Sequence, residues 1–476
     1  MNNPKSKGAI TLLSLCISIF LSSTFFGQNA KITGVAAGQA NELVRIITYD
    51  DQFSKLEKTI ASTTTDKDGS FSLELTADQS LFSYLAVGLK RGEFYLSPNA
   101  TYHFNVLPDT ITQRGSIFDE LPLQFTYKIE DEGLSENIGS FNVQYNTFLY
   151  QYANQIYHGR NKSFISEFES KIDEQFSSYD NTYLKNYIRY SFASLEWTSK
   201  MKNNDSIISE YFAGSPILYN NIQYAEFFSD FFKTYFIADK VFAYHEFISA
   251  INEESSVKAI KSLIERNKSI KGDRRLTELV TILLLAKKYY NPDVKRQKVL
   301  ELLVDLEKNC EFSENKTVVS NSIKKLKILE SGTKAPEFSL KDKSNTEYGL
   351  NDFQGKFLLL SFIKPDCRVC LDHLRLLDET VKKFNSKVQN LTIVFGDGFF
   401  DVTKYADERD FDWPFLNLNN NILLLEDYNI RAYPSYIIIN PDGTIAMATA
   451  PMPDENLDLY LNRQIKRFEA SQANDK

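Results

Sequence analysis

Two cysteines separated by two residues, Cys367 and Cys370, are the residues of this sequence best suited to chemistry. They follow an apolar run over 357–363 and precede a helical pattern over 371–384. A strand that leads into a helix in this way places the first sulfur at the positive end of the helix dipole, where free backbone N–H groups favour the thiolate. We therefore expect Cys367 to attack a partner's disulfide and Cys370, one turn further in, to resolve the mixed disulfide.

An alternative for the pair is a zinc site or two inert cysteines. A closed zinc site needs four ligands, and the nearby candidates are limited to Cys367, Cys370 and His373. The pattern therefore favours redox chemistry, and we expect neither a metal nor another cofactor.

A segment about sixty residues downstream supports this interpretation. Tyr433 and Pro434 precede an apolar run over 436–439, and Asp442-Gly443 separates that run from a second one over 444–448. An Asp-Gly pair between two apolar runs predicts a β-hairpin. The cysteine pair thus lies in the mixed strand and helix context that a redox C-x-x-C requires.

These segments resemble the TlpA/ResA-like thiol-disulfide oxidoreductases, a family with the thioredoxin fold. The resemblance covers residues from about 331 to 468 and includes the opening segments 332–340 and 350–356. It implies a C-terminal α/β thioredoxin-like fold with Cys367 and Cys370 as catalytic residues. It also implies that Pro434 is the cis-proline that faces the disulfide and binds a substrate backbone, with Tyr433 before it.

The chain departs from the family pattern at three places. Asp366 stands where tryptophan is usual, Arg368-Val369 replaces a Gly-Pro or similar dipeptide, and Ser361 replaces the buried acid of thioredoxins. These changes affect the reduction potential and the turnover rate more than the class of chemistry. They also motivate an alternative function, a non-catalytic surface or peptide-binding protein with a vestigial thioredoxin-like domain.

A peroxidase of the related peroxiredoxin type is a third possibility, because the opening segment shares its Ala-Pro-x-Phe pattern. That chemistry needs a threonine three residues before the peroxidatic cysteine. Lys364 occupies that position relative to Cys367, so the sequence argues against a peroxidase.

The length and composition bound the rest of the chain. At 476 residues the chain is expected to form two to four domains. With 43% hydrophobic and 24% charged residues it has the composition of a globular protein. A formal net charge of -8 gives no electrostatic footprint for nucleic acid, which we exclude as a partner.

The N-terminus predicts a secretory signal peptide over residues 1–28. Lys5 and Lys7 precede an apolar stretch over 9–26, and small or polar residues follow it. A retained membrane anchor is the alternative, since the stretch approaches spanning length, but its serines and threonine weaken that reading. The apolar run continues past Cys16, so a lipid anchor attached to this cysteine is not expected. We expect a periplasmic or otherwise extracytoplasmic protein.

Three domains are expected after the signal: a β-sandwich over 30–110, a mainly helical domain over 111–330 and the thioredoxin-like domain over 331–470. Short alternating runs with turn signals predict the first, and apolar residues at three- and four-residue steps predict the second. The dense aromatic residues over 219–236 either line a groove for a peptide or form core, and their helical spacing favours core.

Cys310, near the end of a helical pattern, is expected to be a lone thiol without a role, or else an acceptor of the disulfide. The whole layout resembles multidomain TlpA-like proteins of Bacteroidota. The expected partners are exported proteins that carry disulfides or thiols, and a reductase or isomerase role would need a membrane electron donor of the DsbD/CcdA type. The direction of electron flow is open.

Overall fold

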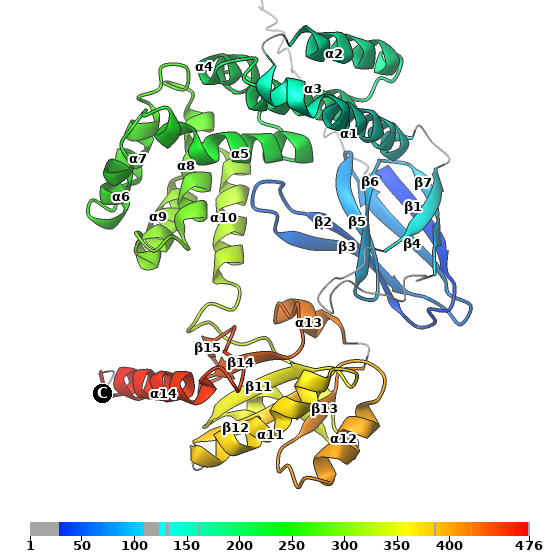
Figure 1. Ribbon diagram of the computed structural model, residues 1–476, viewed down its shortest axis with the longest axis vertical. Coiled ribbons are helices and arrows are strands. Elements are labelled where there is room, and N and C mark those ends of the chain that lie inside the picture. Colours follow the sequence, from blue (N-terminus) through cyan, green and yellow to red (C-terminus); the bar gives the residue numbers. More distant parts are fainter. Residues whose placement is uncertain are drawn as a thin grey trace, which may run out of the picture.

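The computed structural model describes residues 28–108, 123–129, 133–159, 162–384, 387–419 and 421–474. Three regions follow one another: a β-region (28–129), a helical region (134–327) and a C-terminal region (331–474), which lies below the other two in Figure 1. The predicted signal peptide lies outside the described residues apart from its last position. In the described part of the chain, none of the helices combines the length and apolar character needed to span a membrane.

The β-region consists of two four-stranded sheets with strand orders β4-β1-β7-β8 and β3-β2-β5-β6. In β4 buried and more exposed residues alternate, which is the period of two that the sequence predicts, and both sheets contribute to one hydrophobic core. β8 pairs with β7, so residues 125–129, which we had assigned to 111–330, belong to the β-region. The strands are β1 (Gln28–Ala36), β2 (Leu43–Tyr49), β3 (Glu57–Thr64), β4 (Ser70–Ala77), β5 (Leu81–Val87), β6 (Lys90–Leu96), β7 (Thr101–Val106) and β8 (Phe125–Ile129).

The helical region buries its aromatic side chains. Those of α5 from Tyr224 to Phe236 lie in the core of this region, so they are packing residues and do not line a groove. Asn221 caps α5 by accepting the backbone N–H of Tyr224, and Asp273 caps α8 in the same way. The elements are α1 (Leu134–His158), α2 (Ser163–Phe176), α3 (Thr182–Thr198), α4 (Asn204–Ile207), η1 (Ile208–Phe212), α5 (Ile222–Ala238), α6 (Tyr244–Asn252), α7 (Val257–Ile264), α8 (Arg274–Lys288), α9 (Arg296–Asn309) and α10 (Ser313–Lys327).

The loop between β2 and β3 joins the β-region to the helical region. The Phe53 ring packs edge-on against the rings of Tyr224 and Phe228, with centroid distances of 6.1 and 5.4 Å. Asn321 of α10 donates a hydrogen bond of 2.9 Å to the buried Asp51 carboxylate. The two regions therefore share buried contacts and not only a chain connection.

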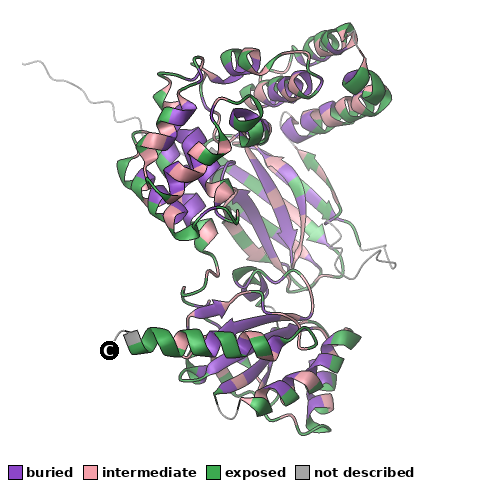
Figure 2. Cartoon of the chain, turned by 60° about the vertical axis from the view of Figure 1, so that its left-hand side comes forward, coloured by how far each residue is buried: buried purple, intermediate pink, exposed green. Residues whose placement is uncertain are grey.

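The C-terminal region is built on a seven-stranded sheet of order β10-β9-β13-β12-β11-β14-β15. Every residue of the central strand β11 is buried, and β11 runs parallel to β12 and antiparallel to β14. Helices α11, α12 and α14 pack on one face of the sheet, and α13 and η2 pack on the other. Figure 2 shows the buried strands of this sheet with the C-terminal helix lying across them. This arrangement is a thioredoxin-like fold, as predicted. The elements are β9 (Ser339–Lys341), β10 (Glu347–Gly349), η2 (Leu350–Phe353), β11 (Phe357–Ile363), α11 (Arg368–Lys383), β12 (Val388–Val394), α12 (Phe399–Asp407), β13 (Phe415–Asn417), α13 (Leu423–Asp427), β14 (Ser435–Ile439), β15 (Ile445–Met447) and α14 (Leu457–Asn474).

An ion pair between the buried Arg45 and the partly exposed Glu426 connects the C-terminal region to the β-region. Arg45 of β2 donates two hydrogen bonds, of 2.6 and 2.7 Å, to the Glu426 carboxylate of α13. Leu89, in the turn between β5 and β6, packs against the hydrophobic core on the α13 face of the sheet. Because α13 leads into the loop before Pro434, these contacts hold that loop next to the β-region.

Candidate active site

Cys367 and Cys370 form a disulfide on the first turn of α11, with their Cα atoms 5.2 Å apart. Cys367 is the N-cap residue, and its Sγ accepts the backbone N–H of Cys370 at 3.2 Å. Cys367 is half-buried, whereas Cys370 is fully buried. The structure therefore leaves Cys367 partly exposed and buries Cys370 completely.

The pairing of β11 with β14 brings the proline loop to the cysteine pair. In this antiparallel pair Ser361 lies opposite Tyr436, so the end of β11 and the start of β14 meet at one edge of the sheet. The Sγ atom of Cys367 lies 3.9 Å from the backbone carbonyl oxygen of Tyr433. The Tyr433–Pro434 peptide bond is cis and Pro434 is buried. The four residues named by the sequence analysis thus lie together.

The segment between β12 and α12 approaches the cysteine turn from another side. Gly398 has a φ of 101°, and a Cβ atom there would lie 3.0 Å from the Cβ of Pro365. A larger residue would be strained in that conformation and would crowd Pro365, which explains the glycine. Val369, in the first turn of α11, and Phe400, in the first turn of α12, are 48% and 70% exposed.

Lys364 and Phe395 are site residues that the sequence analysis did not identify. The Lys364 Nζ lies 4.7 Å from the centroid of the Tyr433 ring and 5.3 Å from that of Phe395, and the two rings stack. Lys364 directly follows β11 and Phe395 directly follows β12, and these two strands are parallel neighbours. Their positions at the ends of two predicted strands could have identified them in the sequence. Where a peroxidase would need threonine, this chain therefore holds a cation over two aromatic rings.

A neutral hydrogen-bond network lies where thioredoxins have a buried acid. The Ser361 hydroxyl is 2.9 Å from the hydroxyl of Thr392 and 3.3 Å from the carbonyl oxygen of Leu391. The Trp413 Nε1 donates a hydrogen bond of 3.0 Å to the Thr392 hydroxyl. No carboxylate at position 361 is available to accept a proton from Cys370.

His373, the third ligand of the zinc alternative, is engaged elsewhere. Its Nδ1 lies 3.0 Å from the Tyr436 hydroxyl, and its Nε2 lies 3.6 Å from the Asp454 carboxylate. Burial, and then the Asp454 charge, raise the pKa of Tyr436, so its phenol stays protonated. Among the residues that the structure describes, no group of three or more His, Cys, Asp or Glu is arranged to hold a metal ion.

Cys310 lies in the helical region, in surroundings that suppress its reactivity. Burial and the adjacent Glu278 carboxylate raise the pKa of its thiol to about 12. The Cys310 Sγ donates a hydrogen bond of 2.9 Å to Glu278 Oε1. At neutral pH the thiol remains protonated, which agrees with a lone thiol without a redox role.

A mixed sheet with helices on both faces, a disulfide on the first turn of α11 and a proline loop beside it define a thioredoxin-like protein of the C-x-x-C type. Residues 331–448 match the model of the AhpC/TSA family. The thioredoxin-like protein YneN of Bacillus subtilis is 30% identical over 120 residues, which cover 25% of this chain and 69% of that protein. The thiol-disulfide oxidoreductase ResA of Geobacillus kaustophilus is 24% identical over 147 residues, which cover 30% of this chain and 84% of ResA.

Through its C-terminal region the chain belongs to the ResA/TlpA-like thiol-disulfide oxidoreductases, within the AhpC/TSA family. Among solved structures, the thioredoxin domain of a thiol-disulfide oxidoreductase from Bacteroides vulgatus is 25% identical, with a TM-score of 0.26. That match covers 29% of this chain and 97% of the solved chain.

Proposed function

We propose that this chain is an extracytoplasmic thiol-disulfide oxidoreductase, a reductase or isomerase that exchanges disulfides with exported proteins through Cys367 and Cys370. The observation that carries the proposal is the unequal exposure of the pair: Cys367 is half-buried at a helix N-terminus, and Cys370 is fully buried behind it. This asymmetry suits one sulfur for attack and the other for resolution. The predicted signal peptide supports export to a compartment where disulfides persist.

In the reducing direction the Cys367 thiolate attacks one sulfur of a substrate disulfide. A bond forms between the two sulfurs, and the other substrate sulfur leaves as a thiolate that takes up a proton. Cys370 then loses its proton and attacks the Cys367 sulfur. This step releases the second substrate sulfur and forms the Cys367–Cys370 disulfide. Two electrons pass to the substrate, so a membrane donor of the DsbD/CcdA type must return two electrons to the protein.

We assign substrate binding to Tyr433 and Pro434. The Tyr433 carbonyl oxygen lies 3.9 Å from the Cys367 sulfur, so a substrate backbone that lies along this loop would bring its own cysteine to the site of attack. The exposed Val369 and Phe400 supply apolar contacts for the surrounding polypeptide. The other regions, a β-sandwich and a helical domain in this proposal, supply the surfaces that select the partner.

A reductive assay with a trapping variant tests the proposal. The Cys370→Ser variant is expected to accumulate mixed disulfides with exported proteins, while the unaltered chain reduces insulin with dithiothreitol as the electron source. The Cys310→Ser variant is the matched control and should behave like the unaltered chain, and a Cys367→Ser/Cys370→Ser variant should be inactive. If the unaltered chain neither reduces insulin nor traps a partner, the non-catalytic binding protein replaces this proposal.

A further inference from the structure

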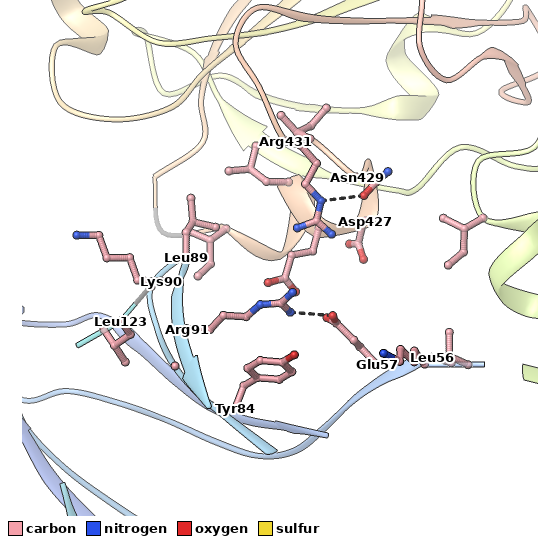
Figure 3. Close-up of a pocket in the computed structure, with 18 of the residues that line it drawn as sticks. Leu56, Glu57, Tyr84, Leu89, Lys90, Arg91, Leu123, Asp427, Asn429 and Arg431 are labelled. Carbon is pink, nitrogen blue, oxygen red and sulfur yellow. Dashed lines mark hydrogen bonds and ion pairs between the residues drawn. The ribbon is translucent and has the colours of Figure 1, made fainter. Parts of the chain in front are cut away.

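A large cavity lies where the three regions meet. It has a volume of about 1890 Å³, and its walls come from the β2–β3 and β5–β6 segments, from α8 and α10, and from the loop that leads to Tyr433. Figure 3 shows Asp427 and Arg431 on the C-terminal side and Glu57, Tyr84 and Arg91 on the opposite wall. Arg91 donates a hydrogen bond of 2.7 Å to Glu57.

The cavity begins at the candidate active site. Lys364, Phe395 and Tyr433 line its wall. The same Tyr433 places its backbone carbonyl oxygen 3.9 Å from the sulfur of Cys367. A polypeptide that occupies the cavity can therefore extend directly to the disulfide. The ion pair between Arg45 and Glu426 keeps this wall in place.

The size of the cavity indicates a polypeptide and not a small molecule. Sites for small ligands typically enclose about 300–1,000 Å³. The cavity here, at about 1890 Å³, is well above that range. An extended chain segment can occupy a space of this volume with its backbone and alternating side chains.

The charges on the walls favour an acidic occupant. The described lining contains seven Lys or Arg residues against five Asp or Glu residues, in a chain whose net charge is -8. Arg91 pairs with Glu57, Lys55 with Glu226, and Glu426 with Arg45. Five Lys or Arg residues of the described lining then remain against three Asp or Glu residues, so the surplus charge of the cavity wall is positive.

Two lysines of the helical wall have neutral hydrogen-bond acceptors. The Lys287 Nζ donates to the carbonyl oxygen of Ser229 at 2.9 Å, and the Lys325 Nζ donates to those of Ser54 and Lys55 at 2.9 and 3.1 Å. Partial removal from water lowers the pKa of both lysines. A carboxylate bound to either lysine would compensate its charge.

We propose that this cavity binds an extended, acidic segment of the polypeptide whose cysteine reacts at Cys367. The inference rests on the thiol-disulfide exchange proposed above and specifies its substrate class. Carboxylates of the segment pair with Lys287 and Lys325 on the helical wall and with Arg431 beside the active site.

Fluorescence anisotropy tests the binding of labelled, cysteine-free peptides of twelve residues to the full chain that carries Cys370→Ser. We expect an acidic peptide to bind at least about tenfold more tightly than its basic counterpart at 0.05 M salt, and this ratio to fall towards one at 1 M salt, where the Debye length is only about 3 Å. Lys287→Gln/Lys325→Gln should weaken acidic binding about three- to tenfold. The matched control is Lys288→Gln/Lys324→Gln, on the same helices but outside the cavity lining, and it should bind normally.

A redox assay separates this inference from the proposed function. With dithiothreitol as reductant, Lys287→Gln/Lys325→Gln in the otherwise unaltered chain should lose kcat/KM for acidic peptide disulfides and keep its rate with uncharged hydroxyethyl disulfide. Equal binding and equal rates for acidic and basic peptides would overturn the acidic-segment proposal and leave the oxidoreductase intact. Turnover of glutathione disulfide with the same lysine dependence would overturn it in favour of a small anionic disulfide as the substrate. Failure to reduce hydroxyethyl disulfide would refute the proposed oxidoreductase function. The anisotropy measurement would still decide whether the cavity binds acidic peptides.

Discussion

Reduction of the Cys370→Ser variant leaves two titratable thiols of opposite character in the described chain, and their reactivities test the electrostatics of the site. The Cys367 sulfur accepts the Cys370 backbone N–H at 3.2 Å, and serine at position 370 retains that N–H group. The Cys310 thiol, by contrast, donates to a carboxylate, and burial and that carboxylate raise its pKa to about 12.

The expected reactivity of Cys367 follows from its contacts. A hydrogen bond to a charged group contributes about 1.5–3 kcal/mol and a helix N-terminus about 0.3–1 kcal/mol, so we take about 2 kcal/mol in favour of the thiolate. At about 1.36 kcal/mol per factor of ten, this lowers the pKa of the thiol and raises its ratio of thiolate to thiol about thirtyfold over that of an ordinary cysteine. Because the nucleophilicity of a thiolate falls as it is stabilised, the net gain in alkylation rate at pH 7 is smaller, about three- to fourfold.

The assay is the pH dependence of iodoacetamide labelling, read by mass spectrometry of the peptides that carry Cys367 and Cys310. Cys367 should label at lower pH than an ordinary cysteine, whereas Cys310, whose thiol pKa is raised to about 12, should remain unlabelled at pH 7 in the folded chain. In urea the two should react alike, which controls for access. A Cys367 midpoint at about 8.5 or above, or equal labelling of both cysteines in the folded chain, would refute this reasoning.

Three other substitutions probe the surroundings of the site. In the Ser361→Asp variant, burial should raise the pKa of the introduced carboxyl, so the native state binds more protons than the unfolded state and the free energy of unfolding falls as pH rises above about 4. Urea unfolding at pH 4 and pH 7 measures this difference. The control is Ser361→Ala, which should cost about 1 kcal/mol at either pH. Glu426→Gln should weaken the contact between the β-region and the C-terminal region by about 1–2 kcal/mol, less than the roughly 3–5 kcal/mol of a fully buried pair because this carboxylate is partly exposed. Hydrogen exchange should show reduced protection of the β2 and α13 amides, and unchanged protection would argue against the ion pair. Adding Arg45→Met to the Glu426→Gln variant should restore part of the lost protection. Phe53→Ala should lower the free energy of unfolding of the helical region by about 3 kcal/mol, as measured in urea. The control Phe400→Ala, at an exposed position, should lower the free energy of unfolding by less than about 0.5 kcal/mol. Equal effects of the two substitutions would contradict the packing assigned to Phe53.

Local patterns were sufficient to predict the elements that carry the cysteines. The apolar run over 357–363 coincides with β11, and the Asp442-Gly443 turn joins β14 to β15. The helix that carries Cys370 begins three residues before the predicted pattern, because Cys367 itself acts as the N-cap. Such features depend on residues adjacent in the chain, where period and capping leave a readable signal.

The sequence could not predict how the regions meet. It suggested neither the stacking of Phe395 with Tyr433 nor the ion pair between Arg45 and Glu426, which are 381 residues apart in the chain. The extended residues 125–129 were assigned to the domain over 111–330, because the sequence does not show that this strand pairs with β7.

The sequence by itself determined the cysteine pair, its position at the start of a helix and the family to which the C-terminal region belongs. The tertiary structure decided which of the two cysteines is exposed, which groups lie near it, and that a cavity with a surplus of basic residues lies where the three regions meet. The physical reason is that burial and electrostatic potential at a site depend on groups brought close by folding, and contacts between residues distant in the chain have no local periodicity that a single sequence displays.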